Sequence, residues 1–196
     1  MIPFFVDIFT DPSDIPLLGR HIKAVGMGYP GDSNDLVVEV VTPDMYPESN
    51  DDSDRDLAYT FRNRVMKVGG NGVGRVRSPM LGVQLVGWDV RTNAWPRLAF
   101  ELLKARAPLY NFAAPLSRKW NDCDMADLKM IVSQGNYLPE SNDMNFKEFM
   151  TFFDGPDLSL AEYDPIAARD VKSIMERRIY EMADLYGRYV EFSGKE

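Results

Sequence analysis

The residues from Phe4 to Ile8 are apolar except for Asp7, and this exception constrains what the chain can fold into. A short run rich in aromatic and β-branched side chains predicts a buried strand. A charged carboxylate in such a strand is costly unless a cation or hydrogen-bond donors compensate it. Phe9 lies two positions further on and therefore points to the same side of the strand as Asp7. The fold must therefore place a cation or hydrogen-bond donors beside the Asp7 carboxylate.

The remaining hydrophobic patterns predict an α/β fold with a mixed sheet. Helices and strands end at Gly, Pro and Asp residues, and short connections between the first three strands favour an antiparallel meander. We expect strands over 4–8, 22–29, 35–42 and 83–88, and helices over 55–67, 95–106, 124–132, around Phe146–Phe153, and from Asp164-Pro165 onwards.

Length and composition limit the classes of function. The 196 residues suffice for one domain with a core, and we expect a single domain over 1–196. One cysteine, Cys123, excludes an intramolecular disulfide and a cysteine-based zinc site, and one histidine, His21, argues against histidine-based catalysis. The net charge of −8 disfavours coating of nucleic acid by bulk charge. We find no signal peptide and no membrane-length apolar run, so we expect a cytoplasmic protein.

Two segments stand out by their charge. Residues 43–54 contain five acids, no base and two prolines, which predicts a solvated loop or, alternatively, a binding face. Residues 68–82 are rich in glycine, and Asn71-Gly72 favours a β-hairpin tip over a nucleotide-binding loop. The basic residues around this hairpin could form a solvated face or a phosphate-contacting arm; they are Arg62, Arg64, Lys67, Arg75 and Arg77.

Three carboxylates lie where strands and the last helix could meet. Asp7 is in the first strand, Asp89 follows the fourth, and Asp170 is expected within the last helix. Carboxylate oxygens suit Mg²⁺ or Mn²⁺, and two such ions can activate water and stabilise a leaving oxygen in phosphodiester cleavage.

With these residues in order, the sequence resembles the DnaQ-like 3′–5′ exonucleases, which have a ribonuclease H-like fold. The resemblance is greatest to the exonuclease type related to family-B DNA polymerases, common in phages. It covers nearly the whole chain, with 43–54 and 68–82 as insertions. The matching segments are Asp7-Ile8-Phe9-Thr10 for D-I-E-T, Trp88-Asp89 with Asn93-Ala94-Trp95-Pro96 for the second motif, Asp124–Leu128, the segment NFKEFMTFFDG, and Asp170-Val171 for the third motif.

The chain departs from the family pattern at the residues that bind metal. The resemblance implies four acidic ligands for two ions, of which Asp7 and Asp170 remain. Phe9 and Ala94 stand where the other two acids belong, and Ile166 stands where the family has a water-orienting Tyr. Loss of single catalytic groups commonly lowers rates about 10²–10³-fold, so we expect little or no hydrolysis and no bound cofactor, or Mg²⁺ or Mn²⁺ if the protein is active.

Three functions are consistent with this pattern. An inactive exonuclease-like protein of phage-type DNA metabolism would bind single-stranded nucleic acid through Trp88, Arg91, Trp95 and the basic arm, or dock on a replication or host protein. Alternatively, an active Mg²⁺-dependent 3′–5′ exonuclease would use Asp7, Asp89 and Asp170. In a third possibility, the acidic stretch 43–56 mimics nucleic acid. A phage-encoded protein would reside in the host cytoplasm.

Overall fold

The computed structural model of the chain describes residues 2–11, 16–47, 52–69, 83–107, 125–132, 146 and 170–194. These residues form an open, mixed five-stranded sheet flanked by helices, so the predicted α/β class is confirmed. None of the described helices is long and apolar enough to cross a membrane.

The sheet has the strand order β3-β2-β1-β4-β5. β2 is antiparallel to both β1 and β3, which confirms the expected meander, whereas β4 is parallel to β1 and β5 is parallel to β4. β1 therefore lies at the centre of the sheet. The strands are β1 (Ile2–Thr10), β2 (Ile22–Pro30), β3 (Leu36–Val41), β4 (Val83–Gly87) and β5 (Met125–Asp127).

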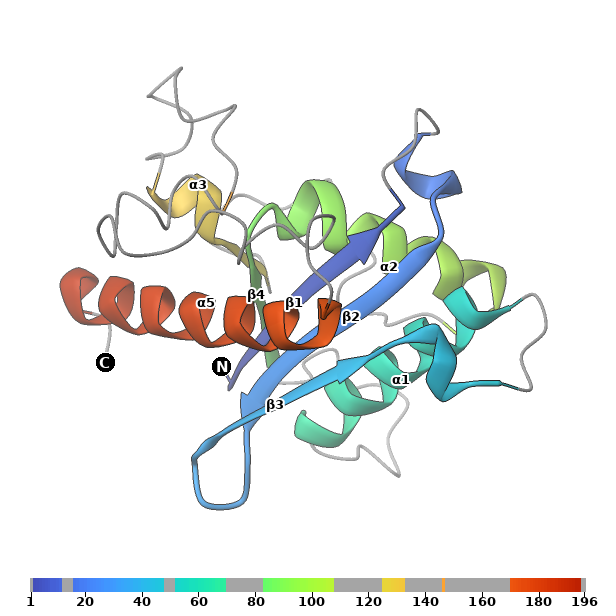
Figure 1. Ribbon diagram of the computed structural model, residues 1–196. Helices are drawn as coiled ribbons and strands as arrows, with labels where there is room; N and C mark the ends of the chain where they lie inside the picture. The colour runs from blue at the N-terminus through green and yellow to red at the C-terminus, as the bar shows by residue number, and fades with distance from the viewer. Residues whose placement is uncertain are drawn as a thin grey trace.

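Helices cover both faces of this sheet (Figure 1). α5 crosses one face over β1, β2 and β3, while α1 and α2 pack against the other face. The α-helices are α1 (Ser53–Val68), α2 (Trp95–Lys104), α3 (Leu128–Val132) and α5 (Val171–Ser193). The short helical turns are η1 (Leu17–Gly19), η2 (Pro43–Met45) and the π-helical η3 (Val90–Ala94).

β1 divides its side chains between the two faces, as the two-residue period of a strand requires. Phe4, Val6 and Ile8 pack in the core beneath α1 and α2. Phe5 packs with α5 on the opposite face, and Phe9 joins a small cluster there. Asp7 lies between Phe5 and Phe9 in the sequence and therefore faces α5.

Two predicted helices have different bounds in the structure. Residues 125–127, expected to be helical, form β5, which is buried beside β4, and α3 begins only at Leu128. A buried strand of three residues has no periodicity by which to recognise it. The last helix begins at Val171 rather than near Pro165, because Asp170 caps it by accepting a hydrogen bond from the Ser173 backbone N–H.

The described ends of the acidic segment 43–54 are not the expected solvated loop. Residues 43–45 form η2, α1 begins at Ser53, and Asp54 is only 13% exposed. The Asp54 carboxylate accepts a hydrogen bond from the buried Arg97 guanidinium at 2.5 Å. Arg97 also donates to Glu101 at 2.5 Å and to the Arg20 carbonyl at 2.7 Å. This network joins α1, α2 and the approach to β2. Most of the predicted glycine-rich hairpin, 70–82, lies outside the described residues.

Glycines in β2 allow α5 to approach the sheet closely. A Cβ added at Gly28 would lie 2.4 Å from Ile179 Cγ2, and one at Gly26 would lie 3.2 Å from Ile179 Cγ1. By contrast, a Cβ added at Gly187, in α5 itself, would meet no atom within 4 Å. The two glycine positions therefore differ in the space available to a side chain.

We predict opposite effects of alanine at these positions. Gly28→Ala should lower the free energy of unfolding by about 1–3 kcal/mol, because α5 must move away or Ile179 must change rotamer. Gly187→Ala should raise it by about 0.5–1 kcal/mol, because alanine is the better helix former. Urea denaturation of both variants measures this, and equal effects of the two substitutions would contradict the described packing of α5.

Candidate functional site

The cation that compensates Asp7 is a protein side chain, Arg178 of α5. The Arg178 Nε donates to Asp7 Oδ2 at 2.5 Å, and the Ile8 backbone N–H donates to Asp7 Oδ1 at 3.0 Å. Both oxygens of the carboxylate therefore have donors inside the protein. The Asp7 side chain is almost fully buried and that of Arg178 is mostly buried, so the pair lies in a region of low polarity where its attraction is strong.

Aromatic rings surround this ion pair. The Arg178 guanidinium carbon lies 4.8 Å from the centre of the Phe146 ring, a cation–π distance. Phe146 in turn packs on Trp88, with their ring centres 5.4 Å apart. Phe9 packs in the neighbouring cluster that contains Val171 and Met175 of α5. These contacts keep water away from the Asp7–Arg178 pair.

Asp170 has a different partner and a different position. Its carboxylate accepts hydrogen bonds from the Ser173 hydroxyl at 2.7 Å and from the Ser173 backbone N–H at 3.2 Å. The hydrogen bond from the Ser173 hydroxyl, above all, lowers the pKa of Asp170. Arg178 follows Asp170 by eight residues, or about 12 Å along the axis of a helix. Asp170 is exposed at the start of α5, whereas Asp7 contacts that helix further along, at Arg178.

Asp89 also has its own cation. Its Oδ2 lies 3.2 Å from Lys129 Nζ. The backbone of Asp89 is left-handed, with φ 53°, and the π-helical turn η3 begins directly after it. Non-glycine residues with positive φ and π-helical turns are both uncommon and often occur near functional sites.

A buried acid at the end of β5, Asp127, holds this turn in place. Asp127 Oδ1 accepts from the Asp89 backbone N–H and Oδ2 accepts from the Arg91 backbone N–H, each at 3.2 Å. Burial raises the pKa of Asp127, and the nearby charge of Asp89 raises it further. The contacts of Asp127 are thus those of a residue that fixes the connection from β4 to α2.

These carboxylates do not fit a two-metal centre. Within the described parts of the chain, no three His, Cys, Asp or Glu side chains lie close enough together to hold an ion. Asp7, Asp89 and Asp170 are engaged by Arg178, Lys129 and Ser173, respectively. A divalent cation at any one of them would have to displace or share that partner.

The remaining positions that depart from the family pattern lie elsewhere. Ala94 is buried in the core cluster beneath α1 and α2, whereas Asp7 faces α5. A carboxylate at position 94 would be surrounded there by apolar side chains. Ile166 lies outside the described residues.

The residues predicted to bind nucleic acid are dispersed. Trp88 and Trp95 are core residues, 5% and 6% exposed, so stacking on a base would require them to leave the core. Arg91 donates from its guanidinium to the Met125 carbonyl at 3.3 Å. In α1, Arg64 forms two hydrogen bonds to Glu39, at 2.6 and 2.9 Å, while Arg62 and Lys67 occupy neighbouring positions. Arg75 and Arg77 lie outside the described residues.

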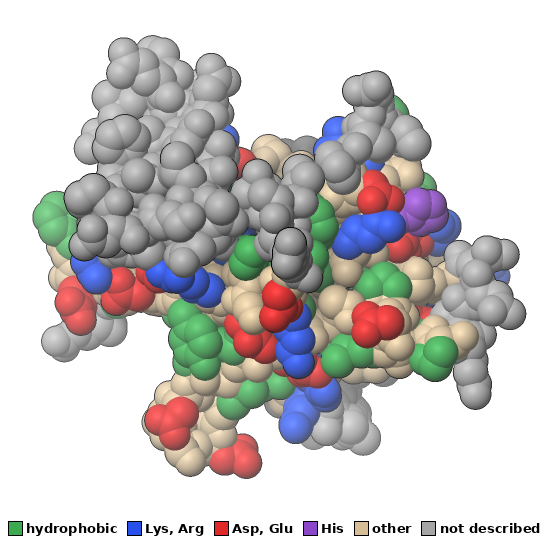
Figure 2. All heavy atoms as spheres, viewed as in Figure 1, with side chains coloured by type: hydrophobic (Ala, Val, Ile, Leu, Met, Phe, Trp, Pro, Cys, Tyr) green, Lys and Arg blue, Asp and Glu red, His purple; other side chains and the backbone are tan. Residues whose placement is uncertain are grey.

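Most described cations lie beside an acid. On the face shown in Figure 2, Lys and Arg side chains alternate with Asp and Glu side chains and form no separate basic patch. The ion pairs are Lys23–Asp11, Arg55–Asp52, Arg64–Glu39, Arg97–Asp54, Arg97–Glu101, Lys104–Glu101, Lys129–Asp89, Arg177–Glu181, Arg178–Asp7 and Arg188–Asp184. Among the residues that the structure describes, most positive charge is therefore matched by a carboxylate.

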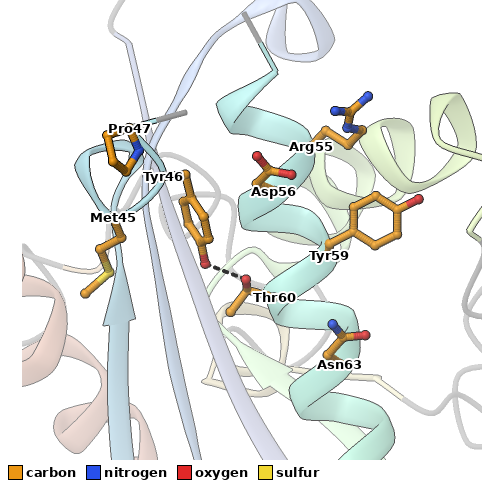
Figure 3. A pocket seen from close by; sticks show the side chains of 8 residues that line it. All are labelled: Met45, Tyr46, Pro47, Arg55, Asp56, Tyr59, Thr60 and Asn63. Atoms are coloured by element: carbon orange, nitrogen blue, oxygen red, sulfur yellow. Dashed lines mark hydrogen bonds between the residues drawn. The ribbon is translucent and has the colours of Figure 1, made fainter. Parts of the chain in front are cut away.

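A groove of about 710 Å³ lies on the other side of the sheet from Arg178, between η2 and α1 (Figure 3). The η2 side contributes Met45, Tyr46 and Pro47. The α1 side contributes residues at about one-turn spacing, among them Asp56, Thr60 and Asn63. The Tyr46 hydroxyl and the Thr60 hydroxyl are hydrogen-bonded at 2.5 Å and join the two walls. We refer to this feature as the η2–α1 groove.

Arg178 was not predicted as a member of the site, although the sequence contains a signal for it. Arg178 lies three residues after Met175 and four before Met182, which places it next to the apolar stripe of α5. A single Arg beside the apolar stripe of a helix and a single Asp in an apolar strand are candidates for a buried pair. The residues alone could not show that these two elements face each other.

Comparison of the sequence with protein-family models gives no match, and comparison with curated proteins gives none either.

The Asp7–Arg178 pair should be strongly coupled. Arg178→Met leaves a buried carboxylate without a counter-ion and should lower the free energy of unfolding by about 3–5 kcal/mol. The double variant Asp7→Leu/Arg178→Met removes both charges and should recover most of that loss. Chemical denaturation of the single and double variants measures the coupling. If the effects of the two substitutions on the free energy of unfolding were additive, a direct interaction between Asp7 and Arg178 would be contradicted.

Asp127 should give the stability a specific pH dependence. Because its pKa is raised in the folded state, the folded protein holds the proton more tightly than the unfolded chain does. This contribution to the free energy of unfolding therefore grows as pH falls through the raised pKa towards the ordinary Asp value. We predict that the free energy of unfolding of wild type increases relative to that of Asp127→Asn as the pH falls from about 7 to about 4. A difference that stays constant with pH would contradict this assignment.

Proposed function

We propose that the chain is an exonuclease-like domain of the ribonuclease H-like type that does not hydrolyse nucleic acid and acts in phage-type DNA metabolism by binding. The observation that carries the proposal is the Asp7–Arg178 ion pair. In the motif resemblance, Asp7 is the first metal-binding acid. Here the Arg178 guanidinium of α5 already supplies the positive charge that compensates the Asp7 carboxylate.

The topology of the sheet supports the proposed relationship. An antiparallel meander of three strands, followed by parallel strands on the other side of β1, is the arrangement that the resemblance implies. Asp7 is on the central strand β1, and Asp89 follows the adjacent parallel strand β4. The motifs align Asp7 with the first metal-binding acid of the exonucleases, and Asp89 is the acid that could replace a lost ligand.

Electrostatics argue against metal binding in this conformation. A Mg²⁺ ion at Asp7 would have to take the place of Arg178 and would then lie close to the displaced guanidinium. Two cations near one carboxylate repel each other strongly in a partly buried site. Phe9, beside Asp7 on the same face of β1, offers no oxygen to compensate. The geometry therefore favours a stable ion pair over an ion-binding cleft.

The Asp7–Arg178 pair and the adjacent Phe9 support a binding role over a catalytic one. A domain that has lost metal-binding acids but keeps hydrophobic clusters on both faces of its sheet, as the described residues do, can still present a surface to a partner. The partner is single-stranded nucleic acid or a replication or host protein. The pairing of most described cations with acids favours the protein.

A nuclease assay tests this proposal. Labelled single-stranded DNA is incubated with Mg²⁺ or Mn²⁺ and with wild type, Asp7→Asn, or the control Asp32→Asn, which changes an exposed acid in the β2–β3 turn. We predict the same background release of product for all three, because the Asp7 carboxylate is held by Arg178.

Product release by wild type that Asp7→Asn abolishes and Asp32→Asn preserves would overturn the proposal. The alternative of an active, rearranged site additionally requires that Asp89→Asn and Asp170→Asn abolish the same activity. These two variants therefore separate a true active site from a contaminating nuclease, whose activity would be unaffected by any of the substitutions.

A further inference from the structure

We draw no further inference here: the strongest candidate, the η2–α1 groove, has one acid and one cation in its lining, Asp56 and Arg55, each of which already has a partner, and nothing in the described part of the chain shows what occupies it.

Discussion

A carboxylate buried in the central strand of a sheet requires a counter-charge, and the rest of this structure is arranged to supply it. Asp7 points away from the core beneath α1 and α2 and towards α5, where Arg178 meets it. Gly26 and Gly28 in β2 let α5 lie close enough for that contact. Phe146 covers the guanidinium and packs on Trp88. The position of α5, the aromatic layer and the charge of the site thus depend on one another.

The same principle applies to the other acids near the carboxyl ends of β1, β4 and β5. Lys129 neutralises Asp89, backbone N–H groups satisfy Asp127, and Ser173 satisfies Asp170. Each carboxylate has a separate local partner, whereas a catalytic metal centre requires several carboxylates to share one ion. In the described residues these carboxylates are used in separate local contacts. That is the physical basis for the binding role that we propose.

The sequence predicted the parts of this structure that repeat over several residues. The meander, β4, α1 and α2 follow from alternating or helical hydrophobic patterns, and the strand face of Asp7 follows from the position of Phe5 and Phe9. It did not predict β5, because three buried residues show no period, or the start of α5 at Val171, because Asp164 and Asp170 are both suitable caps. Arg178 was missed for a different reason: a long-range pair depends on which helix packs on which face, and local patterns do not contain that information.

A crystal structure of the protein grown with Mn²⁺ would test the central claim most directly, through an anomalous difference map around Asp7. We predict no Mn²⁺ peak at the Asp7 carboxylate and an Arg178 Nε that remains within hydrogen-bonding distance of Oδ2. A Mn²⁺ peak about 2.2 Å from Asp7, with Arg178 turned away and Asp89 or Asp170 drawn in as a second ligand, would contradict the account.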